Sequence, residues 1–235
     1  MAFATKTDPF GIVGSAGILE CVSVTDNKTA SVAEAHDENG SFVAHEVFGE
    51  QIAPSAEYKV KKDGNISATL GAVTTYDTKR VVLTNLQVNT SAGGETTVSA
   101  SGEEVETSTD GTCPAQFATG NIAVGVCHHA RNNISDLTIG GTGCYLQSAN
   151  YTYACSIGKA TKDGVTIAHG VYEGYVEAQI EIIQTGSTAP TLTLANDSAW
   201  FISSPLSQTN PDADYPTWSA TLRKHLTMTT PSSSS

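Results

Sequence analysis

Short stretches in which apolar and polar residues alternate, or in which β-branched residues gather, recur along the chain. Between Val176 and Ile182 every second residue is apolar, which places those side chains on one face of a strand. Residues 79–88 (KRVVLTNLQV) form the most apolar strand candidate of the first half. The same criteria predict strands at 17–24, 41–48, 57–64, 95–102, 165–172, 191–195 and 199–203, and two strands within 144–157 about Ser148–Asn150. The chain is therefore predicted to be mainly β.

Helix signals are few. Residues 114–133 could hold one short helix, whereas 217–226 is ambiguous. Trp218, Leu222 and Leu226 have helical i, i+4, i+8 spacing, yet the segment matches a strand candidate elsewhere in the chain. We expect a helix only before residue 133.

The sequence repeats itself weakly. GSFVAHEVF at 40–48 is matched by GVTIAHGVY at 164–172, displaced by 124 residues. TVSA at 97–100 returns in the same order as TWSA at 217–220, displaced by 120. Two matches in one order indicate an internal duplication, which changes the set of folds to be considered.

Both nine-residue segments begin at a favoured hairpin turn. Asn39-Gly40 and Asp163-Gly164 are preferred two-residue turn pairs, so each copy is expected to fold a hairpin whose second strand starts directly after the turn. We predict tandem β-sandwich or barrel modules with few short helices. The expected boundaries are a first β module at 10–107, a linker at 108–122, a second β module at 123–228 and a flexible tail at 229–235.

The chain is acidic, with a formal net charge of −12 from 24 acidic and 12 basic residues. That balance opposes adhesion to a nucleic-acid backbone, which needs clustered Lys and Arg, and its simplest role is solubility. No window approaches about 20 consecutive apolar residues, and residues 1–11 lack a charged-then-apolar signal segment. We expect assembly in a cytoplasm, without a membrane partner.

Cys127, His128 and His129 are the most tempting cluster, because thiolates and imidazoles are good zinc ligands. Adjacent residues on a strand point to opposite faces, so at most two of them could converge without a bulge. The sequence offers no spaced second pair of ligands. Ordinary packing or an interface histidine is therefore favoured over a metal site, and no metal or cofactor is expected.

Two other sets of residues are candidates for a catalytic site and a calcium site. His45 and His169 are equivalent in the repeat, but Glu46 follows the first and Gly170 the second, so an orienting carboxylate is not duplicated. A shared hairpin or core feature is the simpler interpretation. The acidic run Glu103, Glu104 and Glu106 lies in a polar, turn-rich stretch (102–117) that looks like a linker. It lacks the spacing of a calcium loop, so a solvated face is the default.

Known catalytic motifs are absent from the sequence. No GxSxG, phosphate-binding loop, HExxH or dinucleotide fingerprint occurs, and the chain is expected not to be an enzyme. The cysteines are an odd set of five without a CxxC pair, which favours free, mostly buried thiols. They are Cys21, Cys113, Cys127, Cys144 and Cys155.

Three stretches of the chain resemble bacteriophage virion proteins in their general sequence character. They are SAGILECVSVTD (15–26), AHEVFGEQI followed by SAEYKVKKDG (44–64), and VVLTNLQVNTSAGGETTVSASGEEVE (81–106). In texture and order, although not in a signature motif, the chain resembles tail tube subunits.

This resemblance implies a β-sandwich or barrel whose strands join those of its neighbours into a continuous inner barrel. Most such tubes stack hexameric rings, and those with two tube domains per subunit stack trimers with pseudo-sixfold symmetry. The duplication favours the second kind. The implied partners are further copies of the chain and other tail proteins, with DNA passing an acidic bore without specific binding, and the implied location is the virion, assembled in the bacterial cytoplasm.

Three alternatives remain open at this point. A capsid decoration or tail-terminator protein could have a similar acidic β-rich chain. A carbohydrate-binding or adhesin sandwich would need exposed aromatics in a cleft, to which Trp200 and Trp218 are the first candidates. An enzyme would need a polar cleft built from loops.

Overall fold

The structure is a computed structural model that describes residues 8–14, 17–36, 38–39, 41–105, 115–126, 130–162, 165–209 and 215–229. These residues form strands and connections and include no helix. The strands are β1 (Val13–Gly14), β2 (Leu19–His36), β3 (Phe42–Val60), β4 (Gly64–Ser67), β5 (Thr69–Leu70), β6 (Val73–Tyr76), β7 (Lys79–Ser91), β8 (Thr97–Glu104), β9 (Gln116–Ala118), β10 (Ile122–Val124), β11 (Leu137–Gly140), β12 (Cys144–Lys162), β13 (Val165–Gln184), β14 (Thr191–Leu194), β15 (Phe201–Gln208), β16 (Thr217–His225) and β17 (Met228–Thr229).

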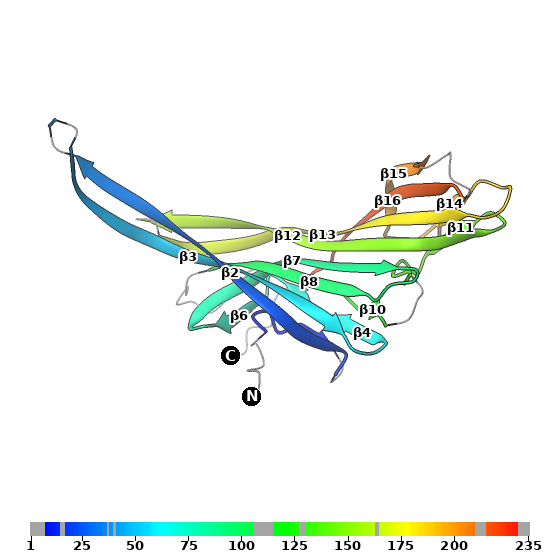
Figure 1. Ribbon diagram of the computed structural model, residues 1–235, viewed down its shortest axis with the longest axis horizontal. Helices are drawn as coiled ribbons and strands as arrows, with labels where there is room; N and C mark the ends of the chain where they lie inside the picture. The colour runs from blue at the N-terminus through cyan, green and yellow to red at the C-terminus, as the bar shows by residue number, and fades with distance from the viewer. Residues whose placement is uncertain are drawn as a thin grey trace.

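One large antiparallel sheet organises the molecule (Figure 1). It has nine strands, in the order β15-β16-β13-β12-β7-β8-β3-β2, with β6 attached beside β7. Burial alternates along β8, where Val98, Ala100 and Gly102 are buried and the residues between them are only half-buried. This alternation is what a sheet with one covered face requires.

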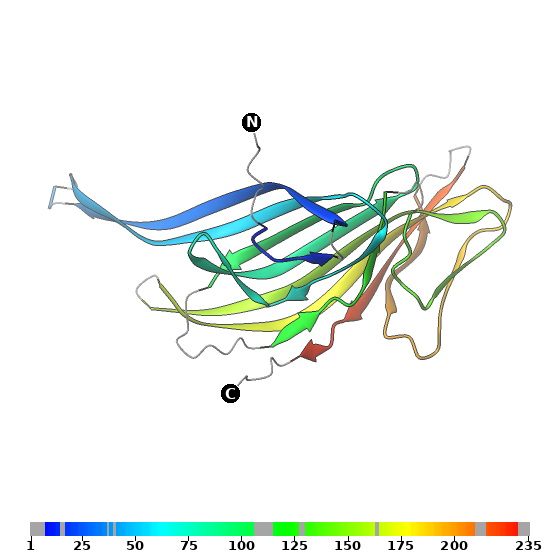
Figure 2. The same cartoon turned by 90° about the horizontal axis from the view of Figure 1, so that it is seen from below.

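Three small sheets cover that face. They are β1-β4-β10, β5-β9-β17 and β11-β14, and Figure 2 shows the first two lying across the large sheet near the chain termini. Ile66, Leu70 and Ile122 of the small sheets are fully buried against it. The large sheet contributes Leu86, Val88, Tyr151, Val176, Ala178, Ile180, Ile182 and Leu222 to the same core.

The expected short helix before residue 133 is wrong for the described part of that segment. Residues 116–118 and 122–124 are the strands β9 and β10, which complete the two small sheets beside β5 and β4. The ambiguous segment 217–226 is strand β16, which extends through His225. Its apolar residues meet a neighbouring strand on each side, so tertiary pairing outweighs their helical spacing.

The long hairpins β2–β3 and β12–β13 were predicted only in fragments. The return strands start at Phe42 and Val165, while Gly40, Asp163 and Gly164 of the expected turn pairs lie outside the described residues. However, 144–157 is one continuous strand and not two. Likewise residues 42–48 and 57–60 of two expected strands belong to the single strand β3, which ends at Val60. Bulges let each strand continue past residues that would otherwise interrupt it.

Both hairpins contain the same three irregularities. In β2–β3 the register shifts lie at Cys21/Ser23, Thr29/Ser31 and Ala35/His36. In β12–β13 they lie at Leu146/Ser148, Ala154/Ser156 and Ala160/Thr161. Each shift in β12 is 125 residues after its counterpart in β2. His45 and His169 occupy equivalent places, opposite Glu34 and Lys159 respectively.

The middle irregularity illustrates how closely the two hairpins correspond. Its extra residues are Gly49-Glu50 in β3 and Glu173-Gly174 in β13. Glu173 has a positive φ of 57°, as bulges often require. A side chain at Gly174 would collide with the ring of Phe117 on β9, so glycine is needed for that close approach.

The remaining strands of the large sheet repeat in the same way. β8 pairs with β3 and β7, and β16 pairs with β13 and β15. Thr97–Ser101 of β8 occupy the register places that Thr217–Thr221 occupy in β16. The sheet therefore reads as β2-β3-β8-β7 followed by β12-β13-β16-β15, joined without interruption between β7 and β12. The module boundaries given above remain a prediction, and residues 116–118 of the expected linker form β9.

A pair of neighbouring substitutions tests the covered and open faces. Leu222 is fully buried and Thr221 beside it points to the other face. Leu222→Ala should lower the free energy of unfolding by about 2–5 kcal/mol, because it leaves a cavity. Thr221→Ala should change it by no more than about 0.5 kcal/mol. Urea unfolding of the unassembled protein measures both, and equal effects would contradict the assignment of the faces.

Candidate assembly interface

The large sheet ends in two strands that have a neighbour on one side only. Among the described strands, β2 pairs with β3 and β15 pairs with β16. Residues 25–30 of β2 are all exposed, as is every residue of β15 except Leu206. An edge strand offers unpaired N–H and C=O groups to a further strand. These two edges are therefore the first candidates for contacts with other molecules.

The contact between β7 and β12 shows how such edges can be joined in this fold. We call it the internal seam. The strands pair antiparallel over seven residue pairs, from Asn85–Ala154 to Ser91–Ser148. β7 is the last strand of the first half of the sheet and β12 the first strand of the second. The seam is thus an edge-to-edge contact between equivalent halves, formed within one chain.

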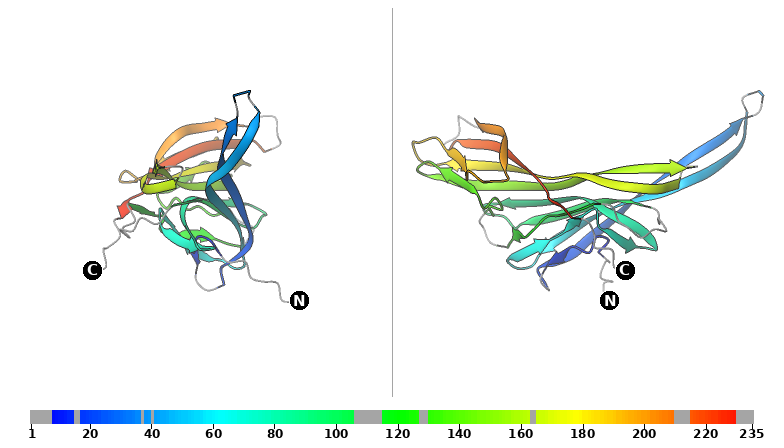
Figure 3. Two further views of the ribbon diagram at one scale, coloured as in Figure 1. Left: turned by 90° about the vertical axis from the view of Figure 1, so that its left-hand side faces the viewer. Right: turned by 180° about the vertical axis from the view of Figure 1, so that it is seen from behind.

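Beyond the seam, the distal part of each long hairpin extends past the sheet as a two-stranded arm (Figure 1). The first arm comprises residues 31–36 and 42–48, and the second arm comprises 156–162 and 165–172. Figure 3 shows that the first arm projects well beyond the rest of the molecule. Val32, Phe42 and Val43 on it are 55%, 56% and 63% exposed.

The second arm, in contrast, lies on the first half of its own chain. Near its base the thiol of Cys155 approaches the carbonyl oxygen of Leu83 at 3.8 Å. Farther along, Lys159 forms an ion pair with Glu103 of β8, with a 2.8 Å separation between Nζ and Oε2. Val171 on the return strand is buried. The two arms therefore have the same backbone pattern but different surroundings.

The open face of the large sheet carries mostly uncharged polar residues in rows. Register relates the members of each row across neighbouring strands. One row is Glu57, Ser99, Gln87, Thr152, Glu177 and Arg223, the next is Lys59, Thr97, Asn89, Asn150, Gln179 and Thr221, and a third is Ser91, Ser148, Glu181 and Ser219. The three rows together contain three glutamates, one lysine and one arginine, so their net charge is only slightly acidic.

The two equivalent histidines lie on different arms. His169 is half-buried, and its Nε2 is buried without a hydrogen-bond partner among the described residues. Its neighbours Arg80 and Lys159 are cationic. His45 lies on the first arm, opposite Glu34 in the register. Each histidine thus marks the same place in its hairpin.

The candidate metal ligands Cys127, His128 and His129 lie outside the described residues. Among the described residues, no group of three or more His, Cys, Asp or Glu side chains is placed to hold a metal ion. Cys144 and Cys155 are free thiols, and Cys21, Cys144 and Cys155 are all half-buried. Burial, followed by the nearby charge of Glu103, raises the pKa of the Cys155 thiol to about 12. That thiol is therefore protonated and unreactive at neutral pH.

Glu103 and Glu104 of the acidic run form separate ion pairs. Glu103 and Glu104 are the last residues of strand β8, so they do not lie in a linker, while Glu106 is outside the described residues. Glu104 accepts hydrogen bonds from Lys79 Nζ at 2.9 Å and from the backbone N–H of Ile52 at 2.8 Å. Successive residues of a strand point apart, and each glutamate here has its own lysine.

Removing these carboxylates separately should have unequal effects. Glu104 is mostly buried, so Glu104→Ala removes the ion pair with Lys79, takes the acceptor from the Ile52 N–H and should cost about 1–3 kcal/mol of stability. Glu103 is about half exposed, so Glu103→Ala should cost less than about 1 kcal/mol. Urea unfolding measures both, and calcium should not shift the wild-type midpoint. A calcium-dependent midpoint would restore the calcium-loop interpretation.

His169 should make stability depend on pH. Burial, with the charges of Arg80 and Lys159, lowers its pKa in the fold below the usual 6.5. The unfolded chain therefore binds the proton more readily, so stability is lost as the pH falls through 6.5 towards the lowered pKa. His169→Gln should lose less stability than the wild type between pH 7 and 5 in urea titrations. Parallel losses would contradict this role.

The two tryptophans do not form an exposed aromatic cleft. Trp200 is buried, and Trp218 is half-buried with its indole Nε1–H donating to Gln184 Oε1 at 2.9 Å. A surface hollow of about 490 Å³ beside β3 and β8 is lined by neither.

No helix able to cross a membrane occurs in the described residues.

Comparison of the sequence with protein-family models and with curated proteins gives no match. The edges, the arms and the open face are thus the features from which a function must be argued. Sequence reasoning did not locate them, because the edge position of β2 and β15 depends on the strand order. The hairpin turns and the repeat were the available signals.

Proposed function

We propose that this chain is a structural subunit that assembles edge to edge into rings and stacks into a tube, as in a bacteriophage tail. The observation that supports this most is the internal seam. Two equivalent halves of the chain already meet through β7 and β12, and the sheet still has open edges at β2 and β15. A head-to-tail contact of this type closes into a ring when its rotation allows it.

The strand directions support the same proposal. All neighbours on the main path are antiparallel. Because the path has eight strands, β15 and β2 run in opposite directions, so adding a second copy at either edge preserves the alternation. Three copies would supply 24 strands to a closed barrel with pseudo-sixfold symmetry. Closure of a barrel removes every edge.

The open face supplies a suitable bore. Ser, Thr, Asn and Gln dominate its rows, with the few charges nearly balanced. DNA adheres to surfaces through clustered cations, and this face offers few. The tube lining would therefore let DNA pass because it is polar and poor in cations, more than because it is strongly acidic as the net charge alone suggested.

A tail-terminator or decoration role uses similar edges but ends at one ring or on one shell. The position of the protein in the virion distinguishes these roles, because a tube subunit repeats along the whole tail. Trp200 and Trp218 form no exposed cleft of the kind that the carbohydrate-binding alternative needs. Among the described residues, no group of His, Cys, Asp and Glu side chains is placed to hold a metal ion. A structural role within a homo-oligomer is therefore the proposal.

Purified protein should form rings or tubes when it is concentrated. Negative-stain images should show end-on rings and, on stacking, tubes of constant diameter, and sedimentation velocity should show species larger than the monomer. Tube formation should not require DNA or divalent cations. A chain that stays monomeric at millimolar concentration, with no rings in the images, would overturn the proposed function.

A further inference from the structure

We infer that the first arm of one copy lies on the second half of the next, and that Glu34 there forms an ion pair with Arg223. This inference rests on the proposed assembly and specifies its contact. The argument uses the internal seam as the model for the contact between copies. Equivalent residues follow from register, with β2 matching β12 at a displacement of 125 and β8 matching β16 at 120.

The internal ion pair has a counterpart with its charges exchanged. Lys159 on the second arm pairs with Glu103 on β8. The residue equivalent to Lys159 is Glu34 on the first arm, and the residue equivalent to Glu103 is Arg223 on β16. Opposite charges thus meet again if β15 of one copy joins β2 of the next as β7 joins β12. Independent drift of the two positions would as readily have produced like charges.

Among the described residues, Arg223 has no carboxylate partner. Its guanidinium lies 4.1 Å from the centre of the Tyr175 ring, and its Nε is buried with no hydrogen-bond acceptor in the part of the chain that the structure describes. No acidic group among the described residues is within ion-pair distance of it. A buried guanidinium N–H without an acceptor is costly, and a carboxylate arriving from a neighbouring copy would satisfy it.

Glu34 is available for this contact. It is exposed, and its side chain reaches only His36 on the same strand, at 3.5 Å, among the described residues. The equivalent Lys159 is largely covered, with a side-chain exposure of 19%. The first arm would gain the same degree of cover by lying on a neighbour.

Apolar residues at the β15 edge fit the same contact. Register places Phe201 and Ile202 where Val82 and Leu83 lie in the first half. Val82 and Leu83 are 0% and 2% exposed, whereas Phe201 and Ile202 are 44% and 40% exposed. Large apolar side chains at an exposed edge point to a partner surface. On the arriving arm, Val32 is equivalent to half-buried Ile157.

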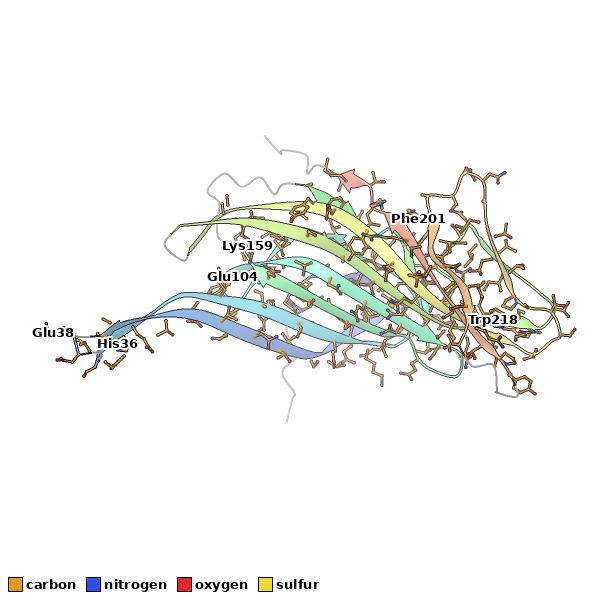
Figure 4. The ribbon with its side chains drawn as sticks, turned by 90° about the horizontal axis from the view of Figure 1, so that it is seen from above. His36, Glu38, Glu104, Lys159, Phe201 and Trp218 are labelled. Atoms are coloured by element: carbon orange, nitrogen blue, oxygen red, sulfur yellow. The ribbon has the colours of Figure 1, made fainter. Side chains whose placement is uncertain are left out.

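Charge exchange tests the ion pair. Glu34→Arg and Arg223→Glu should each lower the assembled fraction at a fixed concentration by about tenfold or more, because like charges then meet. The double variant should restore assembly to within about threefold of the wild type, since the pair is re-formed in reverse. Glu38→Arg, at the exposed tip of the same arm (Figure 4), makes the same charge change without facing Arg223 and should assemble normally.

The outcomes separate the inference from the proposed function. Suppose that the wild type forms tubes. An unaffected Glu34→Arg variant would then overturn the ion pair, and so would a double variant that assembles no better than either single variant. Both results would leave the tube proposal standing. A wild type that never assembles would overturn the tube proposal, and the contact with it. Circular dichroism identifies any variant that fails to fold.

Engineered thiols test the contact without disturbing Arg223. Asn27 is equivalent to Thr152 and Ser207 to Gln87, which are paired in the internal seam. Within one chain they lie on opposite edges, roughly 30 Å apart at about 4.8 Å per strand, so a disulfide between them must join two copies. Asn27→Cys with Ser207→Cys should give covalent multimers on oxidation. Asn27→Cys with Ser203→Cys, four residues out of register, should not.

The single-cysteine variants and the wild type serve as controls, because any cross-link that they form must involve one of the five native thiols. Tubes in which the in-register pair cross-links no better than the out-of-register pair would overturn the proposed register. Covalent rings without tubes would support the contact and contradict stacking.

Discussion

Backbone hydrogen bonding between neighbouring strands is the constraint on which the rest of the structure depends. A strand in a sheet must find partners on both sides or leave polar groups to water. Here the internal seam meets that requirement where the two halves join, over seven residue pairs. The outer strands β2 and β15 have no second partner among the described residues. The proposed assembly uses the two edges that this arrangement leaves open.

Equivalent positions in the two halves have diverged where their surroundings differ. The second arm lies on its own chain and carries Lys159 and half-buried Ile157. The first arm projects from the molecule and carries Glu34 and exposed Val32 at the equivalent places. Backbone irregularities are kept in all three positions, since they set the twist and bend of both hairpins. Geometry was thus preserved while side chains adapted to different contacts.

The sequence predicted the strand-rich class and the equivalence of the two return strands that begin at Phe42 and Val165. These rest on local chemistry, such as the alternation in 175–183 and the Asp163-Gly164 turn pair. It did not predict the lengths of β3 and β12, because bulges at Gly49 and near Ser148 continue strands that local patterns interrupt. Nor could it locate the edges or place Arg223 opposite a partner, since strand order arises from pairings between distant segments.

Tandem duplication changes the energetics of making a ring from such edges. In a ring of six separate modules every seam forms between molecules and pays the full entropy of association. In a ring of three duplicated chains half of the seams are like β7–β12, where the connecting segment supplies a high effective concentration. The other seams remain dependent on concentration and must be selective. Pro205 and the extra residue beside it interrupt β15, and an irregular edge of this kind resists unspecific strand addition. Selectivity then depends on side chains able to recognise one matching arm.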